Sequence, residues 1–373
     1  MCRDLMLATI SSLMFAWSRL TGTAFAESPP WLYFWDRQPS TPLGQSWDLG
    51  RFTTLVAFGD SYTDDNRFNY FDAHNYTPPP IGWAGSADYD TSNSRRLWAA
   101  YVKQYTGANL YNYAVNGAEC SDEITPRTAA PWFNFPTVKE YEIPAYIADS
   151  EYTEPNGKQF LNAPQDETVY AMWIGTNDLG DEALLTDSQV PGTSIVSYTD
   201  CVFNQLQRLY DSGARYFVVF NAAPLNLAPL YGLPGKKGKV VSPYWPDKPS
   251  NTTEISYRMM EQIVTVNAIY QYRTPFMAEV GKTFNGAKFA VFDVHSLMTN
   301  IYNNPSGYLN GTAPLNVAVP VRDCTPEVCI THESPDSHMW WDDLHPSEQM
   351  QRVIAREFVS VIEGKSQYAS YWG

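Results

Sequence analysis

The segment TLVAFGDSYTDDNR, residues 54–67, carries the first strong structural signal in the chain. Its first five residues are apolar or β-branched, and Gly59, Asp60 and Ser61 follow them directly. A short, almost continuous apolar run that ends at a glycine is typical of a buried strand in a parallel sheet. Gly59 permits a tight turn, in which Ser61 could serve as a nucleophile and the following backbone N–H groups could face an oxyanion. The alternative is an ordinary turn whose serine caps a helix.

The strand pattern recurs along the chain and alternates with helical patterns. Gly213 should end the second helix, Pro275 should kink or end the third, and Ser347 should cap the fourth. The alternation predicts an α/β fold, a three-layer α/β/α sandwich around about five parallel strands. Strands are expected at Thr54–Phe58, Asn109–Ala114, Thr168–Ile174, Tyr216–Asn221 and Phe289–Val294, and helices at Arg95–Tyr105, Tyr198–Ser212, Thr253–Val280 and Ser347–Glu363.

The composition indicates a folded, acidic protein. The 373 residues carry a formal charge of -15, 17% of them are charged and 44% are hydrophobic. This excludes a disordered chain, and the negative charge argues against nucleic acid and anionic membranes as partners. After the first apolar run no segment approaches the length of a membrane span. We expect one domain over residues 53–373 that acts as a monomer, preceded by a Pro- and Trp-rich extension, residues 27–52, that wraps its surface.

Residues 1–26 have the layout of a secretory signal peptide. Arg3 precedes the apolar run Leu5–Trp17, and Ala24-Phe25-Ala26 is a small-x-small cleavage motif. The alternative is an anchoring or buried N-terminal helix. We expect the protein to be secreted and extracellular.

An exported chain with four cysteines after the signal peptide suggests two disulfide bonds. Cys324 and Cys329 bracket a short turn and can easily form a local bridge, which would leave Cys120 to pair with Cys201. Three connectivities are possible, and free buried thiols are the alternative. Glycosylation sequons begin at Asn75, Asn251 and Asn310.

Other candidate functional residues lie at the strand ends, where the ligand sites of such sheets are found. Gly117 follows the second strand and could bring its N–H to a substrate oxygen, or it is a plain turn glycine. Asn177 follows the third strand and could donate to an oxyanion, or it caps a helix. Near the C-terminus the run WWDDLHP places Asp342 and Asp343 before His345. A carboxylate can orient a histidine that takes a proton from serine, and the alternative is an acidic surface loop.

The order Ser, Gly, Asn and then Asp-x-x-His resembles the SGNH hydrolases, the superfamily that includes the GDSL esterases and lipases. The resemblance extends from the first strand to the last helix and implies the same three-layer sandwich. It implies that Ser61 is the nucleophile and that Asp342 and His345 are the acid and the base. Gly117 and Asn177 would be oxyanion donors beside the backbone N–H of Ser61.

Two details depart from or blur the family pattern. Tyr62 stands where the family usually has Leu, at a position expected to serve packing. Asp343 lies beside Asp342, and the family spacing favours Asp342. The stretches FGDSYTDDNR, NYAVNGA, MWIGTNDLG and WWDDLHP look most like fungal secreted GDSL esterases of carbohydrate esterase family 16. That resemblance implies an acetylesterase for acetylated sugars or hemicellulose fragments, and the proposed chemistry needs no metal or organic cofactor.

Substrate choice depends on the residues around the serine. Tyr62, Trp340 and Trp341 are candidates to line the substrate pocket, or they pack in the core. Residues 225–250 form a long insertion that could act as a lid. We expect a small-molecule or oligosaccharide ester as substrate, and a lipase or lysophospholipase is the alternative. A non-catalytic carbohydrate-binding protein is less favoured, because all five expected site residues are present.

Overall fold

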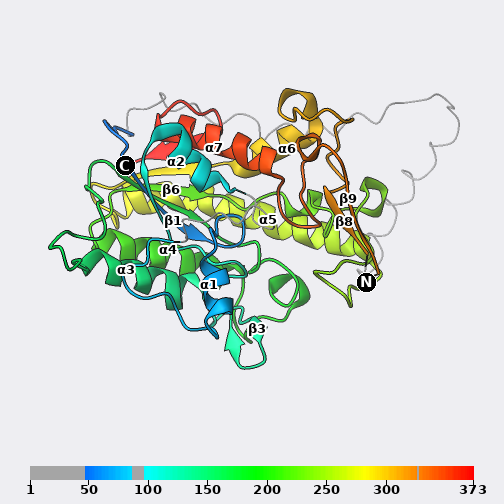
Figure 1. The fold of residues 1–373 in the computed structure, drawn as a ribbon, viewed down its shortest axis with the longest axis horizontal. Helices are drawn as coiled ribbons and strands as arrows, with labels where there is room; N and C mark the ends of the chain where they lie inside the picture. The colour runs from blue at the N-terminus through cyan, green and yellow to red at the C-terminus, as the bar shows by residue number, and fades with distance from the viewer. Residues whose placement is uncertain (1–46, 86–95, 326) are drawn as a thin grey trace, which may run out of the picture. The chain divides into compact units, whose positions relative to one another are not determined.

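The computed structural model describes residues 47–85, 96–325 and 327–373. The main sheet in these residues has six strands (Figure 1). Five strands are parallel, as the sequence predicts, and a sixth pairs antiparallel with β7 at one edge. The spatial order is β10-β7-β6-β5-β1-β2. The strands are β1 (Thr54–Gly59), β2 (Asn109–Asn112), β5 (Thr168–Trp173), β6 (Tyr216–Phe220), β7 (Lys288–Phe292) and β10 (Ala369–Trp372).

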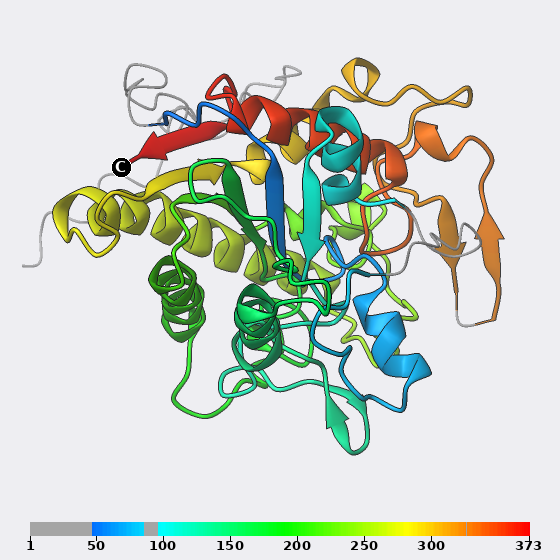
Figure 2. The same ribbon diagram turned by 60° about the vertical axis from the view of Figure 1, so that its left-hand side comes forward.

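Helices cover both faces of the sheet, which confirms the three-layer α/β/α sandwich. In Figure 2, α2, α6 and α7 lie above the sheet and α3, α4 and α5 lie below it. The helices are α1 (Arg67–Ala73), α2 (Trp98–Thr106), α3 (Ile143–Glu151), α4 (Ile195–Asp211), α5 (Thr252–Pro275), α6 (Val294–Asn303) and α7 (Glu348–Ile362). All residues of β1 and β5 are buried, because helices cover these strands on both sides.

The predicted helix ends agree with local geometry. Gly213 follows α4 with a φ of 108°, a left-handed conformation that favours glycine. Helix α5 ends at Pro275, and the chain continues as a π-helical turn over Phe276–Val280. The Ser347 side chain accepts a hydrogen bond from the backbone N–H of Met350 and so caps α7. The sequence did not predict α1, α3 and α6, which have 7, 9 and 10 residues.

A cluster of aromatic side chains fills the core between the sheet and α7. Trp98 of α2 packs with ring centroids 4.8 Å from both Phe220 and Phe358, and Trp173 stacks on Phe220. Burying aromatic rings of this size removes a large apolar area from water. The indole N–H of Trp98 donates to Thr63 at 3.1 Å, so this core cluster also supports the turn that carries Ser61.

Only residues 47–52 of the predicted N-terminal extension fall within the described residues. Trp47 is buried, packs against Tyr216 and Tyr371, and donates its indole N–H to the Ile362 carbonyl at 2.8 Å. The predicted signal peptide, residues 1–26, lies outside the described residues. Among the helices that are described, none combines the length and apolar character that crossing a membrane requires.

Both predicted disulfide bonds are present. Cys120 bonds Cys201, which ties the loop after β2 to helix α4, and Cys324 bonds Cys329. The second bridge joins the short strands β8 (Arg322–Cys324) and β9 (Cys329–Thr331). A second small hairpin consists of β3 (Thr128–Ala130) and β4 (Phe133–Asn134).

Candidate active site

The turn after β1 places Ser61 at the carboxyl edge of the sheet. Gly59 has a φ of 144°, and a Cβ at this position would lie 2.0 Å from the Trp173 carbonyl oxygen of the neighbouring strand. Only glycine therefore fits between β1 and β5 at this point. The buried Asp60 carboxylate accepts from the backbone N–H groups of Tyr62 at 3.0 Å and Thr176 at 3.2 Å. These bonds fix the turn against the loop that carries Asn177.

A second turn, just before α7, presents His345. Asp342 Oδ1 accepts from the backbone N–H groups of Leu344 at 3.0 Å and His345 at 2.7 Å. The buried Tyr62 hydroxyl donates to the Leu344 carbonyl at 2.7 Å, across a sequence separation of 282 residues. Tyr62 therefore joins the serine turn directly to the histidine turn, which a leucine at this position could not do.

The two turns bring Ser61, His345 and Asp342 into one hydrogen-bonded chain. Ser61 Oγ lies 2.9 Å from His345 Nε2, and His345 Nδ1 lies 2.9 Å and 3.0 Å from the two carboxylate oxygens of Asp342. The two ring nitrogens need opposite roles, so we assign the Nδ1 proton as donated to the carboxylate and Nε2 as the acceptor from serine. This arrangement can move the serine proton to the ring as the oxygen attacks a carbonyl.

Gly117 and Asn177 lie on the two loops that flank the serine turn, because β1 lies between β2 and β5 in the sheet. Gly117 has a φ of 85°, and its Cα packs against the Phe135 ring so closely that a Cβ would lie 2.2 Å from a ring carbon. The Asn177 amide donates to the Ala118 carbonyl at 2.8 Å. An amide nitrogen carries two hydrogens, so the second can donate to an oxyanion.

Two carboxyl groups, one partly buried and one fully buried, support these loops. Asp64 accepts from the backbone N–H of Asn116 at 2.8 Å and so holds the Gly117 loop beside the serine turn, and burial raises the pKa of Asp64 to about 6. Glu142 accepts from the backbone N–H of Gly59 at 2.9 Å, and burial raises its pKa well above the ordinary value. Sequence reasoning gave neither residue a role. Asp64 stands in the same quoted segment as Ser61, but nothing in that segment predicts its bond to Asn116, and Glu142 occurs in no pattern with the serine.

The expectation that Tyr62 and Trp340 line the substrate pocket is corrected. Both side chains are fully buried, at 0% exposure, and belong to the core. The Trp340 indole N–H donates to the Val317 carbonyl at 3.0 Å. Trp341 is partly buried, and its backbone N–H donates to the His345 carbonyl at 2.8 Å, so it is part of the histidine turn.

The insertion over residues 225–250 contributes to the site through Tyr244, a residue that sequence reasoning named only as part of a possible lid. Its hydroxyl donates to Asp342 Oδ2 at 2.9 Å. The adjacent acid, Asp343, instead faces the insertion and forms an ion pair with Lys239 at 2.9 Å. Of the two adjacent candidate acids, Asp342 and Asp343, the structure therefore places Asp342 against His345.

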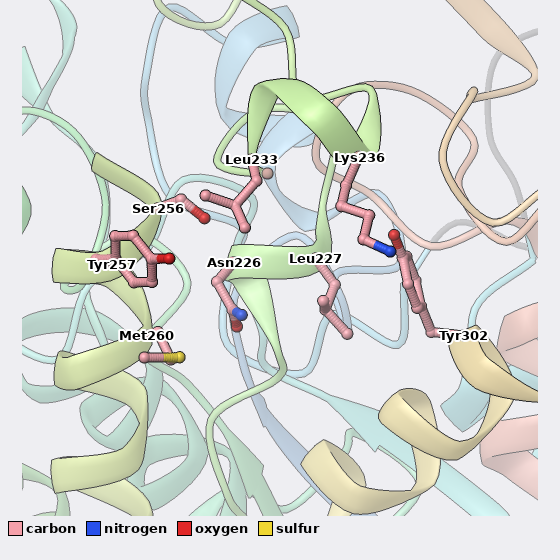
Figure 3. A pocket seen from close by; sticks show the side chains of 9 residues that line it. Asn226, Leu227, Leu233, Lys236, Ser256, Tyr257, Met260 and Tyr302 are labelled. Carbon is pink, nitrogen blue, oxygen red and sulfur yellow. The ribbon is translucent and has the colours of Figure 1, made fainter. Parts of the chain in front are cut away.

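A separate cavity lies between α5, α6 and the start of this insertion (Figure 3). It measures about 60 Å³, which holds a few water molecules and no sugar ring. Its lining includes Leu233, Tyr257 and Tyr302 and none of the predicted site residues. Within the described residues, no group of three or more His, Cys, Asp or Glu side chains could hold a metal ion.

Comparison with known proteins identifies the family of the chain. Residues 55–358 match the GDSL-like lipase/acylhydrolase family. The chain is 38% identical to an acetylesterase of Hypocrea jecorina over 86% of this chain and 92% of that protein. It is 23% identical to a GDSL esterase/lipase of Arabidopsis thaliana, over 86% of this chain and 92% of that protein.

Among solved structures, an acetylxylan esterase from Geobacillus stearothermophilus is similar, with 14% identity and a TM-score of 0.41 over 84% of this chain and 95% of that one. The extent of the family match and the identity to the fungal relative are decisive. The chain belongs to the GDSL-like lipase/acylhydrolase family of SGNH hydrolases and is a carboxylic ester hydrolase.

Proposed function

We propose that this protein is a secreted serine esterase that removes acetyl groups from carbohydrates, with Ser61 as nucleophile, His345 as base and Asp342 as the acid that orients it. The observation that carries the proposal is the continuous hydrogen-bonded chain from Ser61 Oγ through the His345 ring to the Asp342 carboxylate. A serine hydroxyl is a weak nucleophile until a base accepts its proton, and this geometry supplies that base.

In the proposed reaction, His345 Nε2 takes the proton of Ser61 while Ser61 Oγ bonds to the acyl carbon. The carbonyl oxygen becomes an oxyanion that accepts from the backbone N–H groups of Ser61 and Gly117 and from the Asn177 amide. As the bond between the acyl carbon and the sugar oxygen breaks, His345 donates the proton to that oxygen, so the sugar leaves as a free alcohol and an acyl-serine remains. Water, activated by the same histidine, releases the acid and restores the serine.

The acetyl preference rests on the relative in Hypocrea jecorina that is named acetylesterase, at 38% identity over nearly its whole length. The second candidate is an esterase for longer acyl chains, since the Arabidopsis thaliana relative is named esterase/lipase. Initial rates on p-nitrophenyl acetate and p-nitrophenyl octanoate separate the two candidates. We expect the acetate to be hydrolysed faster, and a preference for the eight-carbon chain would favour the lipase.

Ser61→Ala tests the chemistry itself. The variant should lose turnover of p-nitrophenyl acetate and labelling by a serine-directed phosphonate, while its circular dichroism and melting temperature match those of the parent. Wild-type turnover in this variant would refute the nucleophile assignment. A parent protein that ignores the phosphonate and still binds glycans would point to the non-catalytic alternative. Acetate release from acetylated xylo- and manno-oligosaccharides then identifies the sugar.

A further inference from the structure

We propose that Tyr244 is a positioning residue for the esterase reaction. The insertion over residues 225–250 holds Tyr244 beside Asp342, and this insertion is itself bonded to Asp343. This inference rests on the proposed function, since it concerns how the acid of that mechanism is held. The hydroxyl of Tyr244 donates to Asp342 Oδ2 at 2.9 Å, and its ring meets the His345 ring edge-on with centroids 5.6 Å apart.

The two oxygens of Asp342 are held from different parts of the chain. Oδ1 accepts from the backbone N–H groups of Leu344 and His345, which belong to the same turn. Oδ2 accepts from Tyr244, which is 98 residues away in sequence. The carboxylate therefore accepts hydrogen bonds from its own turn at one oxygen and from the insertion at the other. It can rotate only if one of these sets of hydrogen bonds breaks.

The insertion is itself fastened to the neighbouring acid. Asp343 is buried and pairs with Lys239 at 2.9 Å, and it accepts from the buried Ser242 hydroxyl at 2.7 Å. Ser242 Oγ in turn accepts from the backbone N–H of Tyr244 at 3.2 Å. The backbone carbonyl of Asp343 also accepts from the Leu230 N–H at 2.8 Å. The two adjacent acids therefore have different roles. Asp342 contacts the histidine, and Asp343 binds the segment that places Tyr244 beside Asp342.

The hydrogen bond from the Tyr244 hydroxyl partly neutralises the negative charge of the Asp342 carboxylate. This weakens the attraction between Asp342 and a protonated His345, so the base releases its proton more readily to the leaving alcohol. Among the described residues, the charged or titratable groups that face this pair include Asp60, Tyr62 and the Asp343–Lys239 ion pair. Tyr244→Phe leaves each of these side chains in place.

Tyr244→Phe removes the hydroxyl and keeps the ring. We expect kcat on p-nitrophenyl acetate to fall roughly tenfold with KM changed less than about twofold, because one charge-assisted hydrogen bond to the acid is lost. The acidic limb of the kcat/KM profile should move to higher pH, since a carboxylate that lacks the tyrosine hydrogen bond attracts the protonated base more strongly. The matched control is Tyr272→Phe, which changes another exposed tyrosine, this one on α5, and should leave both readouts unchanged.

Ser242→Ala tests the fastening. It should reproduce part of the kcat loss. In the Tyr244→Phe background it should cause no further loss, because both changes interrupt the same chain of hydrogen bonds from Asp343 to Asp342. Melting temperatures near that of the parent show that the variants are folded. Parent kcat and an unshifted pH profile in Tyr244→Phe would overturn the positioning role, and kcat losses that multiply in the double variant would overturn the fastening. Activity in Ser61→Ala would instead refute the proposed function, so the failures are distinguishable.

Discussion

The amide of Asn177 is the site residue whose contribution to rate can be isolated most cleanly. It donates one hydrogen to the Ala118 carbonyl, and in the proposed mechanism its second hydrogen donates to the oxyanion. Asn177→Ala should lower kcat on p-nitrophenyl acetate by about 100- to 1,000-fold with little change in KM, because this donor acts mainly in the transition state. Steady-state kinetics would measure it, and a loss confined to KM would show that the amide binds substrate instead.

Asp178, the next residue, makes stability depend on pH. It accepts from the Cys120 N–H and the Thr125 hydroxyl, and burial raises its pKa to about 7. Because the folded pKa lies above the unfolded one, the folded state binds more protons, and this group's contribution to stability is lost as pH rises from about 4 to about 7. Asp178→Asn should therefore lose less free energy of unfolding than the parent between pH 5 and pH 8, by up to a few kcal/mol.

Urea unfolding of Asp178→Asn and parent at both pH values measures this difference. Thr186→Ala, at a partly exposed position, serves as a control that should follow the parent. Identical pH dependence in Asp178→Asn and parent would show that Asp178 does not bind the extra proton.

At the scale of elements, the disulfide Cys120–Cys201 joins the loop that carries Gly117 to helix α4 across 81 residues. Replacing both cysteines by serine should lower the free energy of unfolding by about 2–5 kcal/mol, since a long loop in the unfolded chain is no longer closed. The activity should fall as well, because the Gly117 loop loses a restraint.

The bridge Cys324–Cys329 is the matched control, because it closes only a short turn with a separation of 5 residues. Its removal should change the melting temperature less and leave the rate on p-nitrophenyl acetate near that of the parent. If the two double-serine variants melt alike and have equal activity, the longer bridge has no special connection with the site.

The elements also show how far sequence reasoning reaches. Strands such as Thr54–Gly59 were predictable because burial on both faces requires continuous apolar runs. Ser61 and Asn177 were predictable because parallel strands bring their ends to one edge. Glu142 and Tyr244 were not, since their contacts with the site arise only when distant loops pack together. The burial of Trp340 could not be predicted either. An aromatic residue next to a site in the sequence has the same pattern whether it lines the pocket or packs in the core.

At the scale of the molecule, export remains a prediction that protein chemistry can test. Expressed in a eukaryotic host, the secreted protein should begin at Glu27, which N-terminal sequencing would show, and retention of residues 1–26 would contradict a cleaved signal. All three sequon asparagines are exposed. The Asn251 side chain caps α5 and donates to Glu254 at 2.8 Å, so Asn75 and Asn310 should carry glycan more completely. Glycopeptide mass spectrometry measures the occupancy of each site.

The bond from Tyr62 to Leu344 has a consequence for how activity arises during synthesis. In the proposed mechanism the nucleophile, Ser61, leaves the ribosome early, and its base, His345, follows 284 residues later. With these roles, we expect that no chain lacking His345 cleaves an ester, even after its first strands have formed. During refolding, turnover should return only with the final docking of the histidine turn, because such long-range contacts form slowly. Enzyme activity thus reports completion of the whole fold.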